Sequence, residues 1–268
     1  MTRKVMAFGA RLKWWRAHRG LAQLALAAAA QTSQRHLSFL ESGRAEPSRE
    51  MVLRLCAVLD IPLRQQNALL LAAGFAPVWR ESDLSSPELA QVNGALDYML
   101  AQQEPYPAFV VDRRWNLLRA NAGAGNLVTF LLGAAPTGSV NLADALVAPD
   151  VLRPFIENWE DVAVHFLRSV QADAVADGTP ETAELLRRLT TYAGVPPLSR
   201  IAPLETHTPV LNIHFRKGDA RLTVFTTIAT LGTPQDVTLQ EIRIECFFPS
   251  DATSAAQFRG WAAERAPA

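Results

Sequence analysis

Residues 23–44, QLALAAAAQTSQRHLSFLESGR, decide the fold of the first part of the chain. The run that begins at Gln23 consists mostly of strong helix formers. Ser33 can cap a second helix and Gly43 can end it. The spacing therefore predicts two short helices joined by a tight turn around residues 30–32.

The second of these helices separates apolar from polar side chains. Leu37 and Leu40 lie three residues apart and are expected to face the interior. In a helix-turn-helix the second helix enters the major groove of DNA, where Gln can pair with adenine, Arg with guanine, and Phe can contact the thymine methyl group. We therefore predict base contacts from Gln34, Arg35, Ser38 and Phe39. Phosphate contacts are predicted for Gln23, Ser33, His36 and Arg44.

The charge distribution supports a nucleic-acid partner for this part of the chain. The net charge of the whole sequence is zero, but residues 1–75 carry 11 Lys and Arg against 4 Asp and Glu, whereas residues 76–268 carry 15 against 22. A basic head on an acidic body is expected where the head meets a polyanion. Charge alone leaves open a helical interaction module whose polar face is only solvated.

Helical periodicity extends over the rest of residues 1–75, which we expect to hold five short helices in total. A stretch rich in Pro, Ser and charge follows, and then an amphipathic helix. We therefore divide the chain into a helix-turn-helix DNA-binding domain at 1–75, a linker and connecting helix at 76–104, and an effector-binding domain at 105–268.

The C-terminal part changes from helical to strand periodicity and back. Two strands are expected at Ala108 to Asp112 and Trp115 to Arg119, followed by several helices. Three strands then follow, and the last of them is expected from Leu239. Together these elements predict an all-α helix-turn-helix domain and an α+β domain with an antiparallel sheet of about five strands.

Two parts of the chain resemble known families. Residues 6–75, and SQRHLSFLESGR at 33–44 above all, resemble the helix-turn-helix of the xenobiotic-response-element regulators, the family of the phage lambda repressor and Cro proteins. The passages PAFVVDRRWNLLRAN and TVFTTIATLGTPQDVTLQEIRIECFFP resemble the ligand-binding domain of MmyB-like transcription regulators, a PAS-like fold. These resemblances imply a bacterial transcription regulator with a sensor cavity for fatty acyl chains or similar apolar molecules.

One position departs from the first of these families. Its members usually have Gly in the turn, where this chain has Gln31, and Gly adopts a positive φ at low energetic cost. We expect the turn either to be strained or to have different dihedral angles. The motif should survive, because a non-Gly residue there costs only about 1 kcal/mol.

The residues of the C-terminal part permit a cavity. One apolar face of an antiparallel sheet must be covered, and the predicted helices that carry Phe130, Trp159 and Phe166 are the available cover. His165 and Arg168, three residues apart on one helix, could hold a carboxylate or another polar head group. The predicted effector pocket comprises Phe109, Phe130, Trp159, His165, Phe166, Arg168, Ile213, Phe215, Thr226 and Ile228.

Alternation along the last strand assigns its two faces. Ile244 and Cys246 are expected on the apolar side of the sheet, and Glu245 on the opposite side. Between the sheet and the helices lies either a filled core or a pocket, and the resemblance to the MmyB-like domain favours the pocket.

Neither an enzyme nor a cofactor is expected. The sequence contains no nucleophile elbow, phosphate loop or dinucleotide fingerprint, its histidines lack companions at metal-ligand spacing, and no apolar run is long enough to span a membrane. We expect a cytoplasmic, nucleoid-associated bacterial regulator that binds double-stranded DNA as a homodimer and responds to a small molecule such as a fatty acid. The alternative is a constitutive DNA-binding protein whose C-terminal domain only dimerises or binds a protein partner.

Overall fold

The computed structural model describes residues 8–198 and 209–265. The chain divides into two compact units. The first contains the residues up to Ser82 together with Pro234–Gln240, and the second contains Asp83–Thr233 and the residues from Glu241 onward. A short segment from late in the sequence is therefore part of the first unit.

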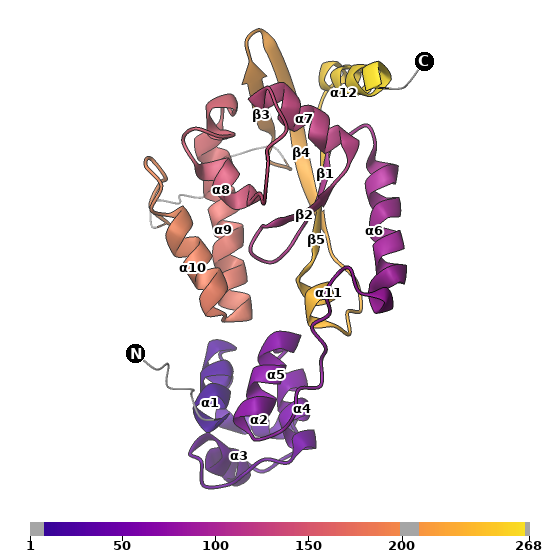
Figure 1. Cartoon of the computed structure of the whole chain (residues 1–268). Helices are drawn as coiled ribbons and strands as arrows, with labels where there is room; N and C mark the ends of the chain where they lie inside the picture. The colour runs from indigo at the N-terminus through magenta and orange to yellow at the C-terminus, as the bar shows by residue number, and fades with distance from the viewer. Residues whose placement is uncertain (1–7, 199–208, 266–268) are drawn as a thin grey trace. The chain divides into compact units, whose positions relative to one another are not determined.

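The described part of the first unit up to Ser82 is built from five α-helices, in the order predicted from the sequence (Figure 1). Their bounds are α1 (Phe8–His18), α2 (Gln23–Ala29), α3 (Gln34–Glu41), α4 (Arg49–Val58) and α5 (Leu63–Ala72). Ser33 and Ser48 cap α3 and α4, since their hydroxyls accept hydrogen bonds from backbone N–H groups in the first turn. Leu37 and Leu40 of α3 are fully buried, as predicted, in the core that the five helices share.

The turn between α2 and α3 retains the backbone conformation that usually requires Gly. Gln31 has a φ of 53°, in the left-handed region. Its backbone N–H donates to the carbonyl of Ala28, and the N–H of Thr32 donates to that of Ala27. This pair of hydrogen bonds ends α2 in a Schellman motif, which needs a left-handed residue at that position. Of the two outcomes expected for the turn, the strained one is therefore observed.

The second unit is an α+β structure with a five-stranded antiparallel sheet, which confirms the predicted fold class. The strand order is β2-β1-β5-β4-β3, so β5 lies at the centre. The strands are β1 (Ala108–Val111), β2 (Leu117–Ala120), β3 (Ile213–Lys217), β4 (Ala220–Ala229) and β5 (Arg243–Pro249). The helices are η1 (Pro87–Leu89), α6 (Ala90–Gln103), α7 (Ala122–Leu132), α8 (Leu142–Val147), η2 (Arg153–Phe155), α9 (Trp159–Asp177), α10 (Pro180–Leu189) and α12 (Ala252–Arg265).

Helices cover both faces of the sheet within this unit. Figure 1 shows α6 on one side of the sheet and α8, α9 and α10 on the other. Phe109, Val111 and Phe247 belong to the large core on the side of α9. Val110 and Ile244, which pair across β1 and β5, are buried outside that core, because side chains alternate along a strand.

The strands β2 and β5 begin later than the sequence predicts. Trp115 was expected to start a strand, but its φ of 65° places it in the turn before β2. Leu239 was also expected to start a strand, but it lies in a short helix, α11 (Val237–Glu241). The carboxylate of Asp236 accepts hydrogen bonds from the N–H groups of Thr238 and Leu239, and this local capping favours the helix over the strand.

No helix within residues 8–198 and 209–265 combines the length and the apolar character that a membrane span requires. The longest of them, α9, carries charged residues in its first turn and buries only one of its faces.

Replacing Gln31 by Gly should stabilise the first unit. The left-handed conformation costs a non-Gly residue about 1 kcal/mol, and part of this gain is offset by the greater freedom of Gly in the unfolded chain. We expect Gln31→Gly to raise the free energy of unfolding by about 0.5 kcal/mol, measured by urea denaturation. In the matched control, Ala28→Gly in the neighbouring helix α2 should lower it by about 1 kcal/mol. A loss of stability in Gln31→Gly would contradict this account of the turn.

Candidate DNA-binding surface and effector cavity

The predicted base-reading residues lie together on the outer side of α3. Gln34 and Arg35 are exposed, and Ser38 and Phe39 are half-buried. The guanidinium carbon of Arg35 lies 5.4 Å from the centre of the Phe39 ring, and that of Arg44 lies 5.6 Å from it. Two cations thus flank one aromatic side chain on an exposed surface. The cations suit a polyanion such as DNA, and the aromatic ring can contact the thymine methyl groups on its base edges.

Two of the predicted phosphate-binding residues have structural roles as well. The hydroxyl of Ser33 accepts a hydrogen bond of 3.1 Å from the backbone N–H of His36, which caps α3. The side-chain amide of Gln23 donates a hydrogen bond of 2.8 Å to Glu41. Arg44 is exposed, just beyond the end of α3.

Glu41 holds α3 against the other helices. Its carboxylate pairs with the guanidinium of Arg16 on α1, with Nε 2.6 Å from Oε1, and the Glu41 side chain is only 3% exposed. Burial by itself would raise the pKa of Glu41, but hydrogen bonds from Arg16 and Gln23 outweigh it and lower this pKa. One buried ion pair therefore fixes the helix that presents Arg35.

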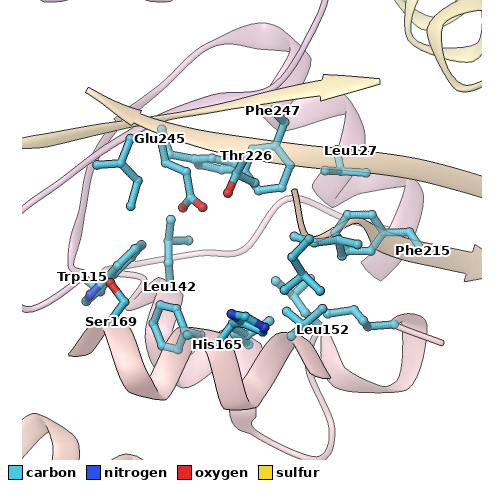
Figure 2. A pocket seen from close by; sticks show the side chains of 18 of the residues that line it. Trp115, Leu127, Leu142, Leu152, His165, Ser169, Phe215, Thr226, Glu245 and Phe247 are labelled. Carbon is cyan, nitrogen blue, oxygen red and sulfur yellow. The ribbon is translucent and has the colours of Figure 1, made fainter. Parts of the chain in front are cut away.

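The second unit contains a cavity between the sheet and the helices of one face (Figure 2). Its volume is about 340 Å³, within the range of small-molecule sites in proteins. Aliphatic and aromatic side chains make up most of its lining. In the described part of the chain, the polar side chains of that lining are His165, Ser169, Thr226 and Glu245.

The electrostatics of the cavity are dominated by Glu245. Figure 2 shows its carboxylate pointing into the cavity beside the Thr226 hydroxyl. Burial raises the pKa of the Glu245 carboxyl to about 7, and hydrogen bonding with Thr226 opposes this shift only in part. Desolvation and the nearby charge of Arg168 lower the pKa of His165, which favours its neutral form. Among the described residues, no group of three or more His, Cys, Asp and Glu residues is placed to hold a metal ion.

Comparison with protein families identifies both units. Residues 12–66 match the helix-turn-helix family, and residues 92–260, more than half of the chain, match the MmyB-like transcription regulator ligand binding domain. The chain belongs to the MmyB-like transcription regulators. It is accordingly a DNA-binding transcription regulator with a ligand-binding domain, as the resemblance of its sequence implied.

Two further comparisons add little. A search of curated proteins found no match. A solved structure described as an RNA-binding light-oxygen-voltage receptor aligns with 96% of this chain at 12% identity, with a TM-score of 0.29, and this chain spans 62% of that chain. A likeness at that TM-score supports no conclusion about the MmyB-like regulator.

Most of the side chains predicted to form the effector pocket line the cavity of the MmyB-like regulator. They are Phe109, His165, Phe166, Ile213, Phe215, Thr226 and Ile228. Three others lie outside its lining. Phe130 packs against Trp261 of α12, and Trp159 donates its indole N–H to the carbonyl of Leu146. Arg168 is half-buried on α9. The sequence predicts that His165 and Arg168 together hold one head group, but of these two only His165 lines the cavity.

The sequence interpretation assigned Glu245 to the wrong face of β5. The charge alternation suggested that Ile244 faces the cavity, but Glu245 and Phe247 do so, whereas Ile244 is buried outside the core that surrounds the cavity. Because β5 has buried side chains on both faces, burial of its apolar residues does not identify the cavity side. Trp115 and Ser169 are also cavity residues that the sequence interpretation did not include.

Arg35 and Arg44 should differ in what they contribute to DNA binding. Arg35→Ala should weaken binding to the preferred duplex by about 1–3 kcal/mol and relax the preference at one base pair. Arg44→Ala should weaken binding to all duplexes and flatten the dependence on salt. Selection from random duplexes, followed by titration at several salt concentrations, measures both effects. An Arg35→Ala variant with unchanged affinity and preference would contradict the assignment of base contacts.

The stability of the MmyB-like regulator should depend on pH through Glu245. The pKa of Glu245 is raised from 4.5 to about 7 in the fold, so the folded state holds the proton of this carboxyl more tightly than the unfolded state does. The resulting contribution to the free energy of unfolding is fully present below about pH 4.5 and is lost as the pH rises through 7. Compared with Glu245→Gln, the wild type should therefore lose up to about 3 kcal/mol of unfolding free energy across that interval. Glu160→Gln, at an exposed position on α9, controls for the removal of one carboxylate. A constant difference between wild type and Glu245→Gln would show that Glu245 is solvated.

Proposed function

We propose that this protein is a homodimeric bacterial regulator whose cavity binds a small, apolar, fatty-acyl-like effector, and that occupancy of the cavity changes its affinity for a two-fold-related DNA operator. The apolar lining and the cavity volume support the effector, and the exposed surface of α3 supports the DNA contact. Because its proposed target is chromosomal DNA, we assign the protein to the bacterial cytoplasm. Its ligand-binding domain is proposed to be PAS-like.

The observation that carries this proposal is the position of residues 234–240. They follow β4 and precede β5, yet they belong to the DNA-binding unit. The side-chain oxygen of Gln240 accepts a hydrogen bond of 2.7 Å from the N–H of Leu63, the first residue of α5. This N–H has no partner within its own helix, so Gln240 caps α5 from a distant part of the sequence.

Further hydrogen bonds hold the same segment to the end of the DNA-binding unit. The carboxylate of Asp236 accepts from the N–H of Ser82 at 3.1 Å, and the hydroxyl of Thr238 donates to the Ser82 carbonyl at 2.8 Å. The N–H of Val237 donates to the carbonyl of Arg80, also at 2.8 Å. Several specific contacts, rather than one, therefore fix this segment.

The two strands that flank this segment both line the cavity. Thr226 and Ile228 of β4 and Glu245 and Phe247 of β5 contribute side chains to its wall. A ligand that favours one arrangement of these strands therefore also biases the segment that caps α5. In a homodimer, a change transmitted to the DNA-binding units would alter the separation of the two α3 helices, which the half-site spacing of the operator constrains.

The coupling should depend on Gln240. Decanol is a suitable neutral, apolar probe of the cavity, and the operator can be obtained by selection from random duplexes. We expect decanol to change the operator affinity of the wild type, within the range of about 5–150-fold that is typical of allosteric coupling. In Gln240→Ala, decanol and operator should each still bind, but the effect of one on the other should largely disappear.

Gln91→Ala, at an exposed position on α6, is the matched control and should respond to decanol as the wild type does. Operator binding that is unaffected by decanol, together with no binding of decanol, would favour a constitutive DNA-binding protein. Native mass spectrometry of the protein with and without operator tests the homodimer in the same samples.

A further inference from the structure

The cavity has one acidic group and no basic side chain of Lys or Arg in its described lining. Glu245 and Thr226 project from β5 and β4 on the sheet side, and His165 and Ser169 project from α9 on the opposite side (Figure 2). The other lining residues are aliphatic or aromatic. The polar part of the cavity is therefore a small site with one carboxyl group, set in an apolar wall.

Glu245 occupies a position where an ionised carboxylate loses hydration, which costs free energy. It lies on the central strand of the sheet, between the buried Ile244 and the cavity-lining Phe247. Its carboxylate points into the cavity, and its raised pKa reflects the loss of hydration there. Within the described chain, no guanidinium or ammonium group of the cavity wall neutralises it. An apolar side chain would fill this position at lower energetic cost, which points to a role in binding.

We propose that the effector carries a basic nitrogen on its apolar body, and that this nitrogen pairs with Glu245 inside the cavity. The inference rests on the proposed function, since it assigns the head group of the effector and not the existence of one. The ligand would supply the positive charge that the cavity wall lacks. Its N–H groups would donate to the Glu245 carboxylate, and its apolar body would pack against residues such as Phe109, Trp115 and Phe215.

The same geometry disfavours a carboxylate head group beside Glu245. Two carboxyl groups in one desolvated site cannot both be ionised without strong repulsion. A carboxylate placed at the opposite wall would meet His165, whose neutral form is favoured, and Ser169. An alkyl amine therefore fits the described lining better than a fatty acid of the same length.

Three probes with the same chain and different head groups test this assignment: decylamine, decanol and decanoate. Isothermal titration calorimetry at neutral pH, below the concentrations at which the probes form micelles, gives each affinity. For the wild type we expect decylamine to bind at least about tenfold more tightly than decanol, the size of a charge-assisted hydrogen bond, and decanoate to bind most weakly.

Variants at the same position separate the charge from the shape of the side chain. Glu245→Gln should lose at least about tenfold in affinity for decylamine and keep its affinity for decanol, whereas Glu245→Asp should keep the preference for the amine. Glu160→Gln, at an exposed position outside the cavity lining, should rank the probes as the wild type does. Bound decanol in each variant also shows that its cavity is folded.

The outcomes distinguish the two proposals. If the wild type binds decanol but prefers decanoate, or if Glu245→Gln keeps the preference for decylamine, the head-group assignment is wrong and the proposed function stands. If the wild type binds none of the three probes, the cavity is not an apolar effector site, and both proposals are wrong.

Discussion

The backbone pairing of β5 is the interaction on which most of this structure depends. As the central strand, β5 hydrogen-bonds to β1 on one edge and to β4 on the other. Its side chains alternate between a core that includes Phe247 and a second buried region that includes Ile244. A shift of this strand by one residue would exchange these two sets of side chains, so its register is tightly constrained. The same register brings Glu245 into the cavity.

The connection between β4 and β5 supplies the residues from late in the chain that belong to the DNA-binding unit. The segment before β5 connects it to β4, and residues 234–240 of that connection are part of the first unit instead of a tight hairpin. Gln240 supplies a cap that α5 lacks locally, since the residue before α5, Pro62, has no side-chain acceptor. The connection is thus part of the DNA-binding unit while both of its ends continue into strands of the cavity wall.

The buried carboxyl groups of Glu41 and Glu245, one in each unit, differ in how their charge is balanced. In the first, Glu41 is neutralised by Arg16 and hydrogen-bonded by Gln23, so the desolvation of the carboxylate is offset within the protein. In the second, Glu245 has a hydroxyl neighbour but no cation in the described cavity wall, and its protonation is favoured instead. An ion pair of the first kind stabilises one arrangement of helices, whereas a carboxylate without a cation in the described cavity wall is better suited to recognise a ligand.

The sequence by itself determined what depends on neighbouring residues. Ser33 and Ser48 cap helices within three residues of themselves, Leu37 and Leu40 follow the helical period, and the left-handed turn at Gln31 closes a motif of a few residues. The α+β class and many aromatic and aliphatic cavity residues followed from periodicity and family resemblance. Only the tertiary structure decided that Glu245 faces the cavity and that Gln240 caps α5, because both depend on contacts between segments far apart in the chain. Alternation along a strand does not distinguish the faces of a sheet that is covered on both sides, and a hydrogen bond across 177 residues leaves no local pattern.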